Sequence, residues 1–346
     1  MIVSVGLWAV SAPAAFFWAR LRCPSVENFA SSLRGASNVE RRGSGGGDWN
    51  EAAPFDASKL AHLDHLVVVC GHAVLTTTAG LEGVEKRDDL WYLLPYQRGH
   101  DLAEAFVSHI ERGVALAAAD ERALLVFSGG ETRAAAGPRS EGLSYWLVAE
   151  HKEWWGRAGP QRSKEEQLDV RQRTVVESYA RDSLENLLFS IARFRQVTGR
   201  YPKRFTVVGF DFKAERFTQL HRAALGIAPA AFAYEGLRPR PSSRFQYQEA
   251  AAGEAAHARQ PFVGDPYGCR NPALVEKKKE RDPFRRAGRS NNGGFRGGGT
   301  GVGDKKGGVA GGPGPGELYA LAAPEIRGLL TWCGPGKYTD ALPWSR

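Results

Sequence analysis

The chain has little cysteine and methionine. Of its 346 residues, four are cysteine and one is methionine, and no two cysteines form a CxxC pair. Isolated cysteines predict neither a disulfide framework nor a zinc knuckle, and they are typical of a protein in a reducing compartment. Cys70 lies inside an apolar run, which favours a small buried hydrophobic residue over a nucleophile. The others are Cys23, Cys269 and Cys333.

The chain also lacks the short motifs of several enzyme classes. It contains no GxGxxG fingerprint and no GxxxxGK[ST] loop, which excludes a standard dinucleotide site and a Walker-type phosphate loop. It contains no GxSxG elbow, so a standard hydrolase triad is excluded. The eight histidines show no HExxH or other paired metal spacing, and we therefore predict no metal site.

The positive charge is concentrated in one segment. The formal net charge is +8, and residues 270–306 hold eleven Lys/Arg against four Asp/Glu, which is +7. The rest of the chain is therefore close to neutral. This distribution argues against a general nucleic-acid-binding face on a folded domain.

The N-terminus, residues 1–30, opens with an apolar segment. Residues 2–19 carry no charge, but Pro13 interrupts them and no basic region precedes them, as a secretory signal requires. Three interpretations stay open: a weak signal anchor, an organelle-targeting leader, or an artefact at the start of the gene model. We predict a cytoplasmic protein, with a membrane-anchored or organellar one as the rival, and membrane contact only through residues 2–19. Residues 31–60 are predicted to be a linker.

Buried strands and amphipathic helices alternate from residue 63 to residue 237. Residues 66–70 and 124–127 are unbroken apolar runs, as expected of strands buried on both faces. Leu184, Leu187, Leu188 and Ile191 form a stripe at helical spacing. Such alternation predicts an α/β fold: a Rossmann-like, three-layer domain with a parallel sheet and helices on both faces.

The composition changes after residue 237. We predict a polar, basic and glycine-rich low-complexity region over residues 238–316, because fourteen of the thirty residues 287–316 are glycine. Its most glycine-rich part is predicted to be a disordered insert. Residues 317–346 are predicted to form a C-terminal segment with a short helix that packs on the domain.

Polar residues gather where the predicted strands end. In a parallel sheet, ligands bind beyond the carboxyl ends of the strands, so these residues are expected to share one edge. The residues that follow the four strands are Gly71, His72, Gly129, Gly130, Thr132, Glu177, Asp182, Ser183, Asp211 and Lys213.

Each of these positions also has a structural interpretation. Gly129-Gly130 could offer backbone N–H groups to an anion or simply form a tight turn. Ser140 before a helix is a common N-cap, and Glu141 suits the helix dipole. As a functional residue, Glu141 would be a general base or would bind a ribose hydroxyl or an amine.

The next helix start has the same two interpretations. Asp182 and Glu185 fit a capping box, which is slightly favoured over a functional role. Asn186 lies at the edge of the apolar stripe, where an amide favours a ligand contact. Lys213 and Arg216 oppose the helix dipole, so they would bind an anion or remain solvated.

The ordered blocks resemble the YdcF–SanA–ElyC family, known as domain of unknown function 218. The resemblance covers residues 66–234 and rests on the strand ending at Gly71, "SGG" at 128–130, "SE" at 140–141, "DSLEN" at 182–186, and Lys213 with Arg216. It implies a Rossmann-like fold with a pocket over the strand ends, and adenosyl-type ligands. His72 and Lys213 depart from the family, which often has Gly and His there.

Two hypotheses follow. In the first, the domain binds an anionic small molecule, with a nucleotide or S-adenosylmethionine as the possible cofactor and with the reaction unknown. Gly71, Gly129, Gly130 and Thr132 would be donors, Lys213 and Arg216 would hold the anion, and Glu141 and Glu177 would be the catalytic carboxylates. In the second, the protein is a non-catalytic binding or scaffold module whose glycine-rich segment recruits an acidic partner or RNA.

Overall fold

The computed structural model describes residues 57–159, 168–240, 246–284 and 315–345. The apolar segment 2–19, nearly all of the predicted linker and the glycine-rich stretch lie outside this part of the chain. The anchor, leader and scaffold interpretations therefore fall on residues that the structure does not describe. Within the described ranges, no helix combines the length and apolarity that crossing a bilayer requires.

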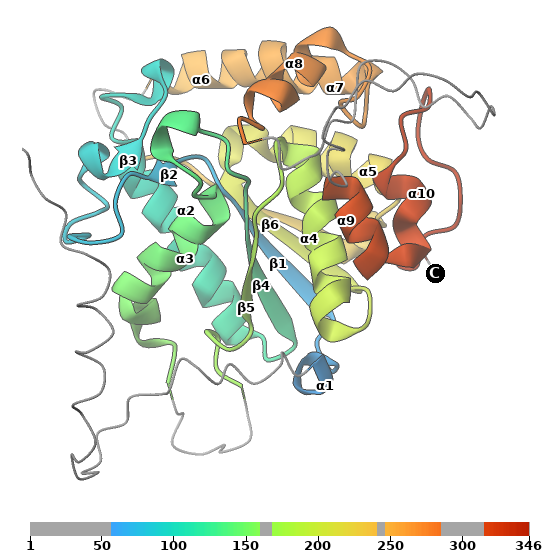
Figure 1. Cartoon of the computed structure of the whole chain (residues 1–346), viewed down its shortest axis with the longest axis horizontal. Helices are drawn as coiled ribbons and strands as arrows, with labels where there is room; N and C mark the ends of the chain where they lie inside the picture. Colours follow the sequence, from blue (N-terminus) through green and yellow to red (C-terminus); the bar gives the residue numbers. More distant parts are fainter. Residues whose placement is uncertain (1–56, 160–167, 241–245, 285–314, 346) are drawn as a thin grey trace, which may run out of the picture. The chain divides into compact units, whose positions relative to one another are not determined.

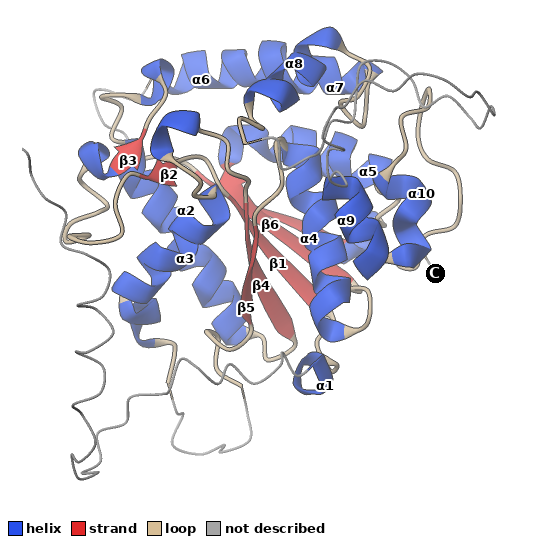
Figure 2. Ribbon diagram, viewed as in Figure 1, coloured by secondary structure: helices blue, strands red, loops and turns tan. Residues whose placement is uncertain are grey.

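Five parallel strands form the central sheet, which confirms the predicted α/β class (Figure 2). Their order is β5-β4-β1-β6-β7. The chain therefore builds outwards from β1 in one direction and then in the other, which is the doubly wound arrangement with its switch point between β1 and β6. The strands are β1 (His65–Cys70), β4 (Ala123–Ser128), β5 (Thr174–Glu177), β6 (Arg204–Phe210) and β7 (Phe232–Leu237).

Alternating side chains of β1 support two separate cores. Leu66 and Val68 pack into one apolar cluster, and Val67 and Val69 pack into the other. All four are fully buried. Because successive side chains of a strand point to opposite faces, one unbroken apolar run can serve both helical layers.

Helices cover both faces of the sheet (Figure 1). One layer holds α2 (Leu102–Ala119) and α3 (Glu141–His151), beside a small antiparallel ribbon of β2 (Val74–Leu75) and β3 (Trp91–Tyr92). The other layer holds α1 (Ala57–Leu60), α4 (Ser183–Thr198), the π-helical turn Arg216–His221 with α5 (Arg222–Ala224), α9 (Pro315–Ala322) and α10 (Arg327–Leu330). The C-terminal residues belong to this second core, where the Trp344 indole donates to the Leu225 carbonyl at 2.7 Å.

Part of the predicted low-complexity region is helical. The helices are α6 (Tyr247–Glu254), a π-helical turn (Ala255–Arg259), α7 (Gln260–Gly264) and α8 (Pro272–Glu280). Figure 1 shows them across the end of the sheet. Phe262 and Leu274 are their buried apolar anchors. The composition gave no sign of these helices, because this layer covers a polar cavity and therefore lacks an apolar stripe.

The two late cysteines are paired. Cys269, between α7 and α8, forms a disulfide with Cys333, which follows α10. The spacing argument gave no sign of this bond, because the cysteines are 64 residues apart and only the tertiary structure brings their Cα atoms to 5.9 Å. Cys70 is free and buried, as predicted.

Candidate functional site

A cavity of about 840 Å³ lies at the carboxyl end of the sheet. We call it the sheet-edge cavity. Its floor comes from residues that follow β1 and β6 and from the starts of α3 and α4, and its roof comes from α6, α7 and α8. The cavity therefore lies at the switch point, where this class of fold binds ligands. The predicted site residues that line it are Gly71, His72, Thr132, Glu141, Asp182, Ser183, Asn186, Lys213 and Arg216.

The predicted glycine donors are engaged by the protein itself. The amide of Gly71 donates to the Ser128 carbonyl at 2.7 Å, that of Gly129 to Glu177 at 3.0 Å, and that of Gly130 to Ala180 at 2.8 Å. These N–H groups are therefore not an anion cradle, and this predicted role was wrong. Gly129 and Gly130 are also absent from the cavity lining.

Two of the glycines make room for Glu141. A Cβ atom at Gly71 would lie 2.5 Å from the Glu141 Cβ, and one at Gly129 would lie 2.7 Å from it. Both separations are too short for real carbon atoms, so the close approach requires glycine. The Glu141 carboxylate accepts a hydrogen bond from the Thr132 hydroxyl, and Glu141 lines the cavity. Glu141 is therefore the predicted catalytic carboxylate that faces the cavity.

Glu177, the other predicted catalytic carboxylate, is outside the cavity lining. It is fully buried and accepts from the Ser128 hydroxyl at 2.6 Å, from the Tyr179 and Ala180 amides, and from the Tyr319 hydroxyl at 3.3 Å. Burial raises the pKa of Glu177 to about 7, although these hydrogen bonds oppose the shift. Its geometry is that of a structural group joining β4, β5 and α9, so a catalytic role is not supported.

Replacing Glu177 by glutamine should change the pH dependence of stability and leave ligand binding intact. A carboxyl group with a raised folded pKa holds its proton more tightly when folded, so the wild type loses stability as pH rises from about 4.5 to 7. Relative to Glu177→Gln, the loss should be roughly 2–3 kcal/mol across that window. Urea unfolding at several pH values measures it. Parallel curves for the two proteins would contradict the burial argument.

Other predicted residues serve local structure. Ser140 caps α3 by accepting the Leu143 amide. Asp182 caps α4 by accepting the Glu185 amide, and the Ser183 hydroxyl is 2.7 Å from His221 Nε2. Asp211 accepts the Tyr247 hydroxyl at 2.9 Å and pairs with Arg238. Ser140 and Asp211 do not line the cavity, and their ligand contacts stay predictions.

Asn186 lines the cavity at the edge of the core. Its side chain hydrogen-bonds the Cys70 thiol, and burial raises the pKa of that thiol to about 11. Cys70 is thus held in the thiol form, which is the poor nucleophile. The predicted ligand role of Asn186 stays a prediction.

Six cationic side chains and five carboxylates line the cavity, and the cations are Arg133, Arg181, Lys213, Arg216, Lys277 and Arg281. Arg216 pairs with Glu254 at 3.0 Å, and both side chains are less than 9% exposed. Lys213 has no carboxylate in ion-pair contact among the described residues, and its ammonium is 3.4 Å from His72 Nδ1. Burial, followed by the charge of Arg216, lowers the pKa of Lys213 to about 8.

Four of these cations were not among the predicted site residues: Arg133, Arg181, Lys277 and Arg281. Burial and the charges of Arg281 and Arg216 lower the pKa of Lys277. The three cations therefore lie close enough to repel one another. Lys277 and Arg281 are four residues apart, which places them on one face of a helix. The four-residue spacing of Lys277 and Arg281 is visible in the sequence, but both lie in the region predicted to be of low complexity.

Aromatic side chains form the apolar part of the wall. The rings of Phe210 and Phe212 stack with centroids 5.0 Å apart, and His72 stacks on Phe210 at 4.8 Å. Phe217 and Phe262 also line the cavity. Burial, followed by the charge of Lys213, lowers the pKa of His72 well below its ordinary value, so this imidazole is neutral near pH 7.

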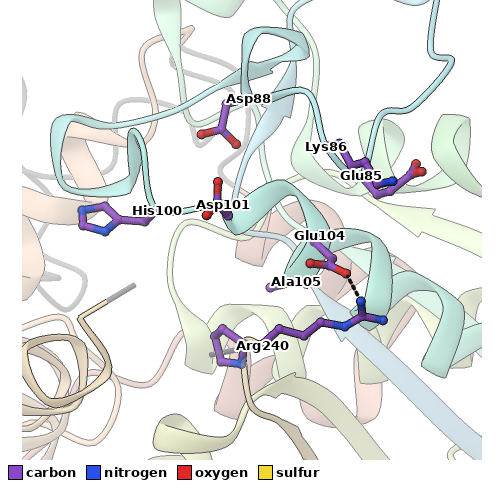
Figure 3. A pocket seen from close by; sticks show the side chains of 9 residues that line it. Glu85, Lys86, Asp88, His100, Asp101, Glu104, Ala105 and Arg240 are labelled. Carbon is purple, nitrogen blue, oxygen red and sulfur yellow. Dashed lines mark ion pairs between the residues drawn. The ribbon is translucent and has the colours of Figure 1, made fainter. Parts of the chain in front are cut away.

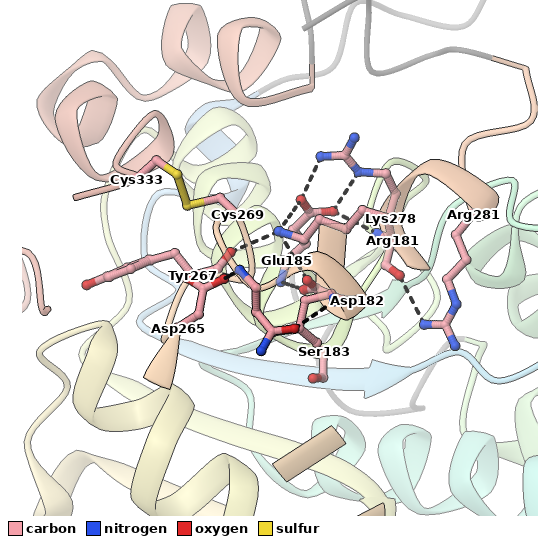
Figure 4. A network of polar contacts seen from close by, with 12 residues as sticks. Arg181, Asp182, Ser183, Glu185, Asp265, Tyr267, Cys269, Lys278, Arg281 and Cys333 are labelled. Carbon is pink, nitrogen blue, oxygen red and sulfur yellow. Dashed lines mark hydrogen bonds and ion pairs between the residues drawn. A yellow bond between two sulfur atoms is a disulfide. The ribbon is translucent and has the colours of Figure 1, made fainter. Parts of the chain in front are cut away.

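An ionic network fastens the roof to the floor (Figure 4). The Lys278 ammonium on α8 is 3.1 Å from Asp182 Oδ2 and 3.2 Å from Glu185 Oε1 at the start of α4. Arg181 adds a pair with Glu185 at 2.7 Å, and Arg281 donates to the Arg181 carbonyl at 3.0 Å. The roof helix α8 is thus held by contacts with residues at the start of α4 that lie more than 90 positions away in the sequence.

A second, smaller cavity of about 180 Å³ lies at the start of α2 (Figure 3). Four carboxylates line it, and Arg240 pairs with Glu104 at 2.8 Å. Arg240 is largely exposed, and the excess of carboxylates repels anions. This smaller cavity is therefore a poor site for an anion. The acidic residues are Glu85, Asp88, Asp101 and Glu104.

The chain is similar to an uncharacterized yeast protein. The chain is 27% identical to the uncharacterized protein YOR238W of Saccharomyces cerevisiae, over an alignment of 229 residues that covers 57% of this chain and 75% of the yeast protein. No family model matches the chain, and no solved structure matches it. The resemblance to the YdcF–SanA–ElyC family therefore rests on the residue blocks alone.

Proposed function

We propose that the protein binds an anionic small molecule of the nucleotide or adenosyl type in the sheet-edge cavity. The observation that carries the proposal is that Lys213, Arg216, Lys277 and Arg281 line one cavity, and that Lys213 has no carboxylate in ion-pair contact among the described residues. Lys213 is partly buried, and a partly buried charge without a counter-charge is unfavourable, so a bound anion would reduce that cost. Lys277 and Arg281 on the roof would close around the same anion.

The size and the apolar wall support a ligand with a planar part. Small-molecule sites commonly have volumes of about 300–1,000 Å³, and this cavity has about 840 Å³. Phe212, Phe217 and Phe262 would contact a base or a similar ring, while the cations would hold a phosphate or a carboxylate. Glu141, with Thr132 beside it, would accept a hydroxyl group of the ligand or take its proton.

Calorimetric titration and thermal shift test the proposal. The ligands are AMP, ATP, S-adenosylmethionine and inorganic phosphate, with uncharged adenosine as the comparison. Lys213→Met should weaken binding of the anionic ligands at least about tenfold, because a partly buried positive charge that would pair with the anion is removed. Lys203→Met is the matched control, since Lys203 is exposed at the opposite end of β6 and should leave affinity unchanged. If none of the anions binds the wild type, the proposal fails.

The compartment is a separate proposal. The N-terminal segment and the scattered cysteines favour the cytoplasm, whereas the Cys269–Cys333 disulfide favours an oxidising compartment. We propose the cytoplasm. The redox state of the Cys269–Cys333 bond in protein isolated from cells distinguishes the cytoplasm from an oxidising compartment.

A further inference from the structure

Lys213 is placed as a reactive amine would be. It ends the turn Asp211–Lys213 directly after β6, and its side chain lines the sheet-edge cavity. The Nζ atom is 5.2 Å from the centre of the Phe210 ring and 3.4 Å from Nδ1 of His72. Its surroundings are thus an aromatic ring and a neutral imidazole, neither of which holds the ammonium form as a carboxylate would.

Neighbouring charges favour the neutral amine further. After burial, Arg216 and Arg281 lower the pKa of Lys213, while Glu254 and Cys70 work in the opposite direction. The resulting pKa of about 8 leaves the amine neutral in about one molecule in ten at pH 7, against fewer than about one in a thousand for an ordinary lysine. Desolvation beside other cations is the arrangement that activates lysine nucleophiles.

His72 fixes the position of the amine. Because burial keeps this imidazole neutral, Nδ1 can accept a hydrogen bond from Lys213 when the ring proton is on Nε2. Stacking on Phe210 and the edge contact with His109, with centroids 5.5 Å apart, hold the ring in place. The lone pair of Lys213 is therefore oriented by a rigid neighbour.

We propose that Lys213 is an amine nucleophile that forms a Schiff base with an aldehyde or ketone carrying a phosphate or carboxylate group. The Nζ lone pair attacks the carbonyl carbon, the C=O bond opens to a carbinolamine, and the C–O bond then breaks. Both amine protons leave with that oxygen as water, so an imine and one water form from one amine and one carbonyl compound. No oxidant or further reactant is needed. The proposal rests on the proposed anionic site, because Arg216, Lys277 and Arg281 would hold the anionic group.

The test traps the imine on the full-length protein. Pyridoxal 5′-phosphate is the anionic aldehyde, pyridoxal is its comparison without the phosphate, and sodium borohydride reduces any imine to a stable amine at pH 7.5. Peptide mass mapping should find Lys213 modified about tenfold or more beyond exposed lysines such as Lys203. Lys213→Arg, which keeps the charge, should lose this adduct, and Lys203→Arg should retain it. The mapping of the wild type gives the answer even if Lys213→Arg does not fold.

The outcomes separate the two proposals. If the phosphate compound labels Lys213 and pyridoxal labels it far less, both proposals are supported. If both aldehydes label Lys213 equally and no anion binds, the reactive amine stands and the anionic site fails. If anions bind by calorimetry but label falls on exposed lysines instead, the Schiff-base proposal is overturned and the anionic site stands. If neither binding nor labelling of Lys213 is found, both are overturned.

Discussion

Replacing Lys278 by methionine should lower the free energy of unfolding by about 3–5 kcal/mol. The ammonium lies between Asp182 and Glu185, and the three side chains are 12%, 5% and 7% exposed. Burial opposes the charge of Lys278, but the two carboxylates raise its pKa above the ordinary value. For Glu185, burial is likewise outweighed by Lys278 and Arg181, which lower its pKa to about 2. Removing Lys278 would leave the buried carboxylates of Asp182 and Glu185 without this counter-charge.

Lys279→Met is the matched control for this effect. Lys279 is the next residue of α8, is 56% exposed, and pairs with Glu276, which is 61% exposed. Exposed pairs contribute about 0–1 kcal/mol, so this variant should unfold like the wild type in urea. An equal decrease in the free energy of unfolding for both variants would show that any lysine-to-methionine change on α8 has this effect, and that the buried ion pairs are not its cause. Lys278→Met should also weaken ligand binding, because Lys277 on α8 and Arg281 directly after it line the cavity.

Reduction of the Cys269–Cys333 disulfide should cost about 4 kcal/mol of stability. The bond closes a loop with a sequence separation of 64, and the chain-entropy estimate for a loop of this length has that magnitude. It also joins the segment before α8 to the segment after α10, so its loss should release the roof more than the sheet. Chemical unfolding with and without a reducing agent measures the change.

Cys333→Ser provides the control for the disulfide. Its stability should match that of the reduced wild type and should not respond to the reducing agent. Alkylation of the denatured, unreduced wild type should leave Cys269 and Cys333 unlabelled and recover them as one linked peptide. Labelling of both residues would contradict the pairing. The same mapping, applied to protein trapped with an alkylating agent inside cells, shows whether the compartment keeps the bond oxidised.

Much of the fold could be predicted from local patterns. The run from Leu66 to Val69 indicates a strand buried on both faces, and the stripe of α4 indicates a helix with one apolar face. These signals are short in range, because side-chain periodicity depends only on neighbouring residues. The location of the cavity also followed, since parallel strands with helical crossovers bring their carboxyl ends to one edge.

The roles of individual site residues were less predictable. Sequence placed Glu141 and Glu177 alike at strand or helix ends, yet Glu141 faces the cavity and Glu177 is buried under Tyr319. The glycines were expected to offer amides, and their amides are taken by neighbouring carbonyls. Lys277 and Arg281 were overlooked because a layer that covers a polar cavity lacks the apolar stripe by which helices are found.

By itself, the sequence determined the layered α/β architecture, the edge of the sheet at which polar residues meet, and the buried thiol of Cys70. The tertiary structure decided which carboxylate reaches the cavity, which lysine lines the cavity without a carboxylate partner among the described residues, and which cysteines pair. The reason is how far apart in the sequence the residues lie that determine each property. Periodicity and capping are set within a few residues, whereas burial, pKa and disulfide pairing depend on contacts between residues that lie 60 or more positions apart.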